Sequence, residues 1–283
     1  MKLAGAVTQG SGSINEDGWG FLGKSGNVGA AWVFDGVTGI NGKNFLGGTT
    51  DAAWFVAKAH AHLLQLAGLD LPLPEILARL VKFLIRDFQI AAEGLDIPKD
   101  FDPPAACLIL LKRYRETWKA LRLGDSCLLA RDGDGAHTIH SASPNNILDH
   151  WLSTEAAKRR SAGVLDIKAL VAEFRPKLLQ GRKLRNTPGG YSILEAKEVA
   201  TKFAEYLDLG TPAEILICTD GYYRAVDHYG LHTDETLIEA SSGNDGVAGV
   251  LASLRAIEAS DPACQTYIRF KPADDATAVL LRK

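Results

Sequence analysis

WVFDGVTG, residues 32–39, is an apolar run that ends abruptly on an acid followed by a glycine. The apolar residues predict a buried strand, and Asp35 with Gly36 forms a dipeptide that is common in tight turns. Taken alone, a turn is the simpler interpretation of Asp35. A functional carboxylate becomes a competing interpretation only if other strands end in the same way.

Four other segments repeat this pattern of an acid beside an apolar strand. They are EILICTDGYY with Asp220, LRLGDSCLL with Asp125, DDATAVLL with Asp274 and Asp275, and INEDGWGF with Glu16 and Asp17. In one layered core the strand ends would bring these carboxylates together, and carboxylates about 3–5 Å apart repel unless cations or protons neutralise them. Mg²⁺ and Mn²⁺ prefer carboxylate and carbonyl oxygens, so we expect a hard divalent metal. The glycine after Asp35 and after Asp220 would let the backbone turn and expose a carbonyl.

Hydrophobic periodicity around these acids predicts an α+β fold in which antiparallel strands form two layers flanked by helices. Strands are expected over 3–10, 18–23, 28–35, 106–113, 117–132, 135–143, 214–220 and 277–283. Helices are expected over 49–67, 76–88, 153–161, 166–179, 195–207, 233–240 and 244–259. The strands between 106 and 143 resemble an antiparallel meander. Residues 144–195 are interpreted as a flap or lid inserted in one domain that spans residues 1–283.

Composition gives no support to several classes of function. The chain has 283 residues, 31 basic and 34 acidic side chains and a formal net charge of −3, so no basic stripe predicts nucleic acid or membrane binding. The first residues, MKLAGAVTQGSGS, fall well short of the apolar core of a signal peptide, and no run approaches the roughly 18 residues of a membrane helix. The four cysteines form no C-x-x-C motif, and three of them lie in apolar runs. We therefore expect a cytoplasmic monomer without disulfides.

Other familiar sites are absent from the sequence. His60 and His62 are two residues apart on a predicted helix and point to different faces, so a zinc site there is disfavoured. Lys43 lacks the upstream glycine spacing of a P-loop, and no G-x-S-x-G is present. Asp132 and Asp134 have no further acid to complete an EF-hand loop and are interpreted as a hairpin turn.

The ordered motifs NEDGWG, FDG, GDS, TDG and DDAT resemble those of the metal-dependent serine/threonine protein phosphatases of the PP2C type, the PPM family. The likeness runs from Asn15 to Leu281, and five motifs in order are far more specific than one. The resemblance implies a β-sandwich of two antiparallel sheets flanked by helix pairs. It also implies a centre of two Mn²⁺ or Mg²⁺ ions, with a third ion as an option, at one edge of the sandwich.

The resemblance carries specific roles onto this sequence. Asp35 matches the carboxylate that bridges both ions, and the Gly36 carbonyl matches a ligand of the second. Asp220 and Asp274 resemble the remaining carboxylates of the first ion. The other matched acids are Asp17 and Glu16, expected near the second ion or its water, and Asp125, which with Asp220 would hold a weaker third ion or else be a turn residue. Two such ions would activate a water and neutralise phosphate oxygens during attack on a phosphate ester of a protein.

Two positions depart from the family pattern. Where many members carry an arginine that grips the substrate phosphate, this chain has Gly12, and where eukaryotic members carry a histidine it has Val37. We expect phosphate to be held by another cation or by backbone groups, and proximity to the motifs suggests Lys43 or Arg224. The leading hypothesis is a phosphatase of phosphoserine and phosphothreonine in proteins. A catalytically weak regulatory module and a phosphatase of a small metabolite stay open.

Overall fold

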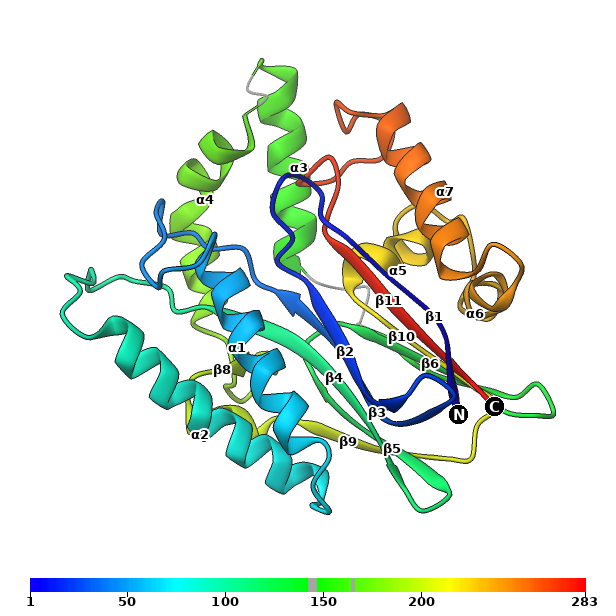
Figure 1. The fold of residues 1–283 in the computed structure, drawn as a ribbon. Coiled ribbons are helices and arrows are strands. Elements are labelled where there is room, and N and C mark those ends of the chain that lie inside the picture. Colours follow the sequence, from blue (N-terminus) through cyan, green and yellow to red (C-terminus); the bar gives the residue numbers. More distant parts are fainter. Residues whose placement is uncertain (142–146, 164–165) are drawn as a thin grey trace.

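The computed structural model describes residues 1–141, 147–163 and 166–283. Within these residues, two antiparallel sheets stack face to face (Figure 1). One sheet has the order β1 (Lys2–Gln9), β11 (Ala276–Arg282), β10 (Glu214–Cys218), β6 (Cys127–Arg131) and β7 (His137–His140). The other has the order β2 (Gly18–Lys24), β3 (Asn27–Gly36), β4 (Ala105–Tyr114), β5 (Thr117–Leu123) and β9 (Glu205–Gly210), with the short β8 (Leu194–Glu195) beside β4.

The apolar run of β3 is buried on both faces. Trp32 and Phe34 belong to the core beneath the helices, whereas Ala31 and Val33 belong to the core between the sheets. Successive side chains of a strand point to opposite faces, so a strand covered on both sides must be apolar without interruption. By the same alternation Asp35 continues the inner face, which directs it toward the space between the sheets.

Helices cover the outer face of each sheet, which gives four layers. Over the sheet of β3, α1 (Asp51–Leu66) and α2 (Leu73–Ala92) pack on one apolar cluster. The Thr50 hydroxyl caps α1 by accepting from the Ala53 backbone N–H at 3.0 Å. Over the other sheet lie α5 (Asp220–Asp227), α6 (Asp234–Ser242) and α7 (Gly246–Ser260). The predicted α+β sandwich flanked by helices is therefore confirmed.

Two further helices stand at one end of the sandwich (Figure 1). They are α3 (Ile147–Ser161) and α4 (Ile167–Arg182), which fall within the segment predicted as a flap. They share a small apolar cluster with Ile40, from the loop after β3, and with the half-buried Phe270. Residues 144–146 and 164–165 of the predicted flap lie outside the described residues. Both helices therefore border the same end of the sandwich to which β3 delivers Asp35.

Two sequence predictions were wrong, and a third strand is shorter than predicted. The single strand expected over 117–132 is broken at Gly124, whose φ of +91° redirects the chain, so β5 and β6 lie in different sheets and no meander forms. The helix expected over 195–207 is replaced by β8, a 3-10 turn (η1, Glu198–Lys202) and β9, because pairing of β9 with β5 outweighs local helix propensity. The strand expected over 135–143 is β7, and residues 142–143 lie outside the described residues.

All four cysteines are buried, and none of the described residues forms a disulfide. A search of the described helices for one with the length and apolar character of a membrane span finds none.

Candidate metal centre

Antiparallel pairing explains why distant acids meet at one end of the sandwich. Gly18 at the start of β2 pairs with Phe34 near the end of β3, which brings Asp17 close to Asp35. In the other sheet Cys218 at the end of β10 pairs with Ala278 at the start of β11, so residues just after β10 and just before β11 are neighbours. The end of one strand always lies beside the start of its antiparallel partner. The predicted acids are gathered by this rule.

Each predicted acid occupies a distinct structural position. Asp35 is the penultimate residue of β3, Asp17 immediately precedes β2, and Asp274 lies two residues before β11. Asp220 does not sit in a turn as expected but is the first residue of α5, where the helix dipole favours a negative charge. Asp125 lies in the link between β5 and β6.

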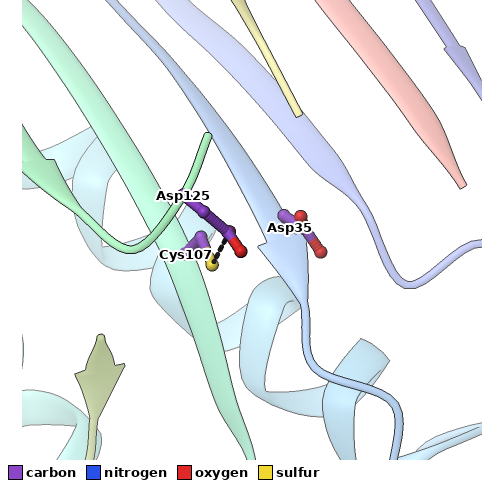
Figure 2. Close-up of side chains that lie close together, drawn as sticks. All are labelled: Asp35, Cys107 and Asp125. Atoms are coloured by element: carbon purple, nitrogen blue, oxygen red, sulfur yellow. Dashed lines mark hydrogen bonds between the residues drawn. The ribbon is translucent and has the colours of Figure 1, made fainter. Parts of the chain in front are cut away.

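Asp35 and Asp125 converge on a cysteine that the sequence had indicated only as a small core residue. Cys107 is the register partner of Asp35 across β3 and β4. Its thiol donates to Asp125 Oδ1 at 3.0 Å, and one donor atom from each of the three side chains lies within 4.8 Å of the others (Figure 2). Burial, followed by the charges of Asp125 and Asp35, raises the pKa of Cys107 well above its usual range.

Burial and mutual repulsion make this centre costly to ionise. Burial, then the charges of Asp220, Asp17 and Asp125, raises the pKa of Asp35 well above its usual range. Burial is also the main cause of the raised pKa of Asp17, although its carboxylate accepts from the Thr219 hydroxyl at 2.8 Å. Burial, then the charge of Asp274, raises the pKa of Asp220 to about 7. The acids therefore influence one another, as expected of a shared site.

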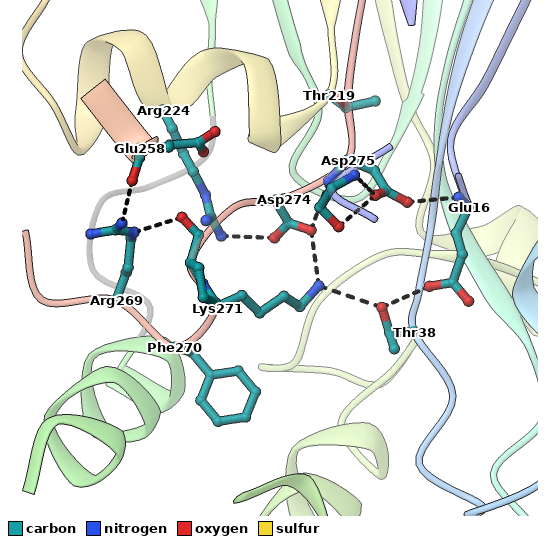
Figure 3. Close-up of polar contacts among 12 residues, drawn as sticks. Glu16, Thr38, Thr219, Arg224, Glu258, Arg269, Phe270, Lys271, Asp274 and Asp275 are labelled. Carbon is teal, nitrogen blue, oxygen red and sulfur yellow. Dashed lines mark hydrogen bonds and ion pairs between the residues drawn. The ribbon is translucent and has the colours of Figure 1, made fainter. Parts of the chain in front are cut away.

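Asp274 is the exception because two cations of the chain contact it. Arg224 Nη2 donates to one carboxylate oxygen at 2.8 Å and Lys271 Nζ donates to the other at 2.9 Å (Figure 3). Burial would raise the pKa of Asp274, but the charges of Lys271 and Arg224 outweigh it and lower the pKa. The same attraction raises the pKa of both cations. Part of the negative charge of the centre is thus already balanced by the protein.

Glu16 and Asp275 fasten the chain around the centre. The Glu16 carboxylate accepts from the Thr38 hydroxyl at 2.7 Å, and the Glu16 backbone N–H donates to Asp275 at 2.6 Å (Figure 3). The other oxygen of Asp275 accepts from the backbone N–H and the hydroxyl of Ser11, at 2.7 and 2.9 Å. These bonds hold the loop before β2 against the loop before β11.

The two Asp-Gly pairs use glycine for close approach and not for a left-handed turn, which corrects the sequence interpretation. Neither Gly36 nor Gly221 has a positive φ. A Cβ at Gly36 would lie 2.3 Å from the Glu16 carbonyl oxygen, and a Cβ at Gly221 would lie 1.9 Å from the Asp275 carbonyl oxygen. Both glycines therefore permit backbones that carry site acids to touch.

The cations near the centre differ from those the sequence suggested. Gly12 has open space around it, and Lys43 stacks over the Phe45 ring at 4.7 Å. Arg224 contacts Asp274, as described. The sequence analysis missed Lys271 and Arg182, which flank Thr38: Lys271 Nζ is 3.4 Å from its hydroxyl, and Arg182 Nη2 donates to its carbonyl at 3.1 Å. No motif marks either cation, because they reach Thr38 from 233 and 144 residues away in sequence.

Residues interpreted as structural behave accordingly. His60 Nδ1 accepts from the Trp32 indole N–H at 3.3 Å, and His62 pairs with Asp87 at 2.8 Å. Asp132 and Asp134 lie in the link between β6 and β7, where the Asp132 backbone N–H donates to the Ala136 carbonyl and an Asp134 oxygen accepts from the Ala136 N–H.

The donor set suits hard divalent cations. Among the described residues, no lysine, arginine or histidine forms an ion pair with Asp17, Asp35, Asp125 or Asp220. Their oxygens are of the kind that Mg²⁺ and Mn²⁺ prefer. Divalent charge would relieve the repulsion that, together with burial, raises the pKa values of Asp17, Asp35 and Asp220.

Comparisons with known proteins identify the family and the fold. Residues 4–242 match the family model described as Protein phosphatase 2C. The search of curated proteins gives no match. The crystal structure of the Mycobacterium tuberculosis serine/threonine phosphatase PstP/Ppp is similar, with a TM-score of 0.55 at 17% identity, and covers 98% of this chain and 96% of that one.

Two more solved structures share the fold. The catalytic domain of the phosphatase PstP in complex with two manganese ions has a TM-score of 0.53 at 17% identity, covering 98% of this chain and 95% of that chain. Serine/threonine phosphatase Stp1 from Staphylococcus aureus has a TM-score of 0.52 at 12% identity, covering 100% and 97%. At these identities the likeness establishes the fold alone. Because the family model spans most of the sequence, the chain belongs to the protein phosphatase 2C family.

Proposed function

We propose that this protein hydrolyses phosphate monoesters with the help of divalent metal, and that its substrates are phosphoserine and phosphothreonine in proteins. The observation that carries the proposal is the convergence of Asp17, Asp35 and Asp220 at one end of the sandwich, where they are half-buried, repel one another and form no ion pair with the described residues. A purely structural core would not gather such groups, since unpaired buried charge is costly.

The proposed metal ligands are those that the family resemblance implies, and the closeness of the acids supports them. Asp35, Asp220 and Asp274 would hold a first ion, and Asp35 with the Gly36 carbonyl, Asp17 and Glu16 would surround a second. Asp125 with Asp220 would hold a third ion. Bound Mn²⁺ or Mg²⁺ would supply an activated water near neutral pH and neutralise phosphate oxygens.

The phosphate group needs a cation of the chain, and Lys271 and Arg182 are the candidates. Both lie beside Thr38, three residues after Asp35. Lys271 is bound to Asp274 and Arg182 to Asp102 at 3.2 Å, so each is held in place by an acid. An arginine or lysine beside the loop after Asp35 could bind phosphate oxygens there. It would take the role of the family's phosphate-binding arginine, whose position is occupied by Gly12 in this chain.

Hydrolysis of an aryl phosphate by the purified protein, with and without Mn²⁺, tests the function. We expect metal-dependent turnover in the wild type and in Asp132→Asn, a change at a hairpin acid far from the described centre. Asp35→Asn should abolish turnover and weaken Mn²⁺ binding in calorimetry. Undiminished hydrolysis in Asp35→Asn would show that the assigned centre is wrong.

Two further measurements separate the competing hypotheses. Comparison of phosphopeptides with small phosphorylated metabolites distinguishes a protein phosphatase from a metabolite phosphatase. Divalent binding in calorimetry without turnover of any phosphate ester would identify a regulatory module and contradict the proposed activity.

A further inference from the structure

The thiol of Cys107 lies beside the Asp35 carboxylate in the candidate metal centre. Cys107 and Asp35 are direct register partners, and both share a strand face with residues of the core between the sheets, Ile109 and Val33. The sulfur therefore points to the same side as the Asp35 carboxylate. Asp125 is the third member of this cluster, and its Oδ1 lies 3.0 Å from Cys107 Sγ.

Local packing fixes this arrangement. Gly124 has a φ of +91°, and a Cβ there would lie 2.4 Å from Cys107 Sγ, so the loop that carries Asp125 is pressed against the sulfur. Cys107 is 6% exposed. No lysine, arginine or histidine among the described residues pairs with Asp35 or Asp125, although Asp274 nearby has two such partners. The two carboxylates beside the thiol thus lack a compensating charge.

The side chains of Cys127 and Cys218, the other two cysteines on strands, point to the opposite side of their sheet, toward the helices. Cys218 ends β10 and Cys127 begins β6, and both belong to the apolar cluster beneath α5, α6 and α7. Cys218 immediately precedes Thr219 and Asp220, so it occupies a strand end next to a site acid, as Cys107 does, yet faces the helix layer. The placement of Cys107 on the inner face brings its thiol beside the side-chain carboxylates of Asp35 and Asp125.

We propose that Cys107, Asp35 and Asp125 form a binding site for a thiophilic divalent cation, Zn²⁺ or its analogue Cd²⁺. Sulfur and carboxylate ligands around tetrahedral zinc are about 3.6 Å apart, given Zn–S of about 2.3 Å and Zn–O of about 2.1 Å. The donor atoms here lie within 4.8 Å of one another, so shifts of about 1 Å would close the site. Thiolate favours Zn²⁺ over Mn²⁺ and Mg²⁺, which prefer an all-oxygen site.

Binding exchanges one bond for another. The Cys107 S–H bond breaks, a sulfur–metal bond forms, and the proton leaves to solvent. Because Asp35 is also proposed to bridge the two catalytic ions, a zinc ion held by Asp35 and Cys107 takes this ligand away from them. Zinc is therefore inhibitory, a consequence that rests on the proposed function, whereas the binding itself does not.

The first test uses Cd²⁺ and ultraviolet absorption on the full chain after chelator treatment. A sulfur-to-cadmium charge-transfer band should rise to one equivalent in the wild type and in Cys218→Ser. It should be absent in Cys107→Ser, with folding checked by circular dichroism. Absence of the band in the wild type, or its loss in Cys218→Ser with Cys107 intact, would overturn the site, and neither outcome depends on how Cys107→Ser folds.

The second test measures inhibition of Mn²⁺-dependent aryl phosphate hydrolysis by Zn²⁺, normalised to the zinc-free rate of each variant. The zinc concentration for half inhibition should rise by about 10-fold or more in Cys107→Ser, because loss even of an outer partner of a metal ligand costs that much affinity. Equal sensitivity in both proteins would overturn the inhibitory role. If no variant hydrolyses the ester, the proposed function fails while the cadmium band still decides the site.

Discussion

Replacing Asp220 by asparagine should stabilise the metal-free protein at alkaline pH and remove the stabilisation that Mn²⁺ provides. Burial and the charge of Asp274 raise the pKa of Asp220 from 3.8 to about 7. Between about pH 4 and pH 7 the folded protein keeps a proton that the unfolded chain has released. The free energy of unfolding therefore falls as pH rises through this window, and the loss is complete above about pH 7.

The magnitude follows from the size of the shift. A pKa that rises from 3.8 to about 7 corresponds to a destabilisation on the order of 4 kcal/mol at pH 8. Asparagine avoids this cost, and its amide oxygen can accept from a protonated Asp35, as the Asp220 carboxylate does in the bond that raises the pKa of Asp35. A chain of this size gains about 2 °C in melting temperature per kcal/mol, so a rise of up to about 8 °C is expected.

Thermal unfolding followed by circular dichroism measures the effect, at pH 5 and pH 8, in a chelator and in Mn²⁺. In the chelator at pH 8 the variant should melt above the wild type, and at pH 5 the difference should shrink. In Mn²⁺ the order should reverse because the wild type binds metal. Asp132→Asn should follow the wild type throughout. A variant that melts below the wild type in the chelator at pH 8 would refute the argument that repulsion dominates at Asp220.

Three further outcomes follow from the same geometry. Gly36→Ala places a Cβ 2.3 Å from the Glu16 carbonyl oxygen, so it should lower the free energy of unfolding by about 1–3 kcal/mol and weaken Mn²⁺ binding. The control Gly12→Ala meets open space and should melt like the wild type. Equal melting temperatures of the two variants would contradict the close-approach argument. Lys271→Gln should lower kcat/KM for an aryl phosphate about 10- to 100-fold, mainly through KM, with Mn²⁺ affinity undiminished and with partial rescue by Lys271→Arg; an unchanged KM would exclude Lys271 from phosphate binding. Mn²⁺ should raise the melting temperature of the wild type more at pH 8 than at pH 5.5, because Asp220 is protonated at the lower pH. If the Mn²⁺ affinity measured by calorimetry does not change with pH, Asp220 does not titrate near pH 7.

Local sequence was sufficient for most elements because their patterns are strong. The continuous apolar run before Asp35 predicts a buried strand, and the periodic residues after Thr50 predict a helix; both are confirmed as β3 and α1. Prediction from the sequence failed where strand pairing in the folded protein overrode the local propensity of a segment. A helix is predicted over 195–207, but residues 205–210 pair with β5 as an edge strand. A single glycine with positive φ at 124 divides what looks like one strand.

The sequence by itself determined which carboxylates would meet, since the order of five acid motifs at strand ends fixes the family and a shared edge. Only the tertiary structure decided what surrounds them. Lys271 and Arg182 reach Thr38 across more than a hundred residues of chain, and Cys107 faces Asp35 because β3 and β4 pair in one particular register. A short motif reflects what the local backbone requires. Charge balance and metal preference depend instead on side chains far apart in sequence, which strand register and loop packing bring together.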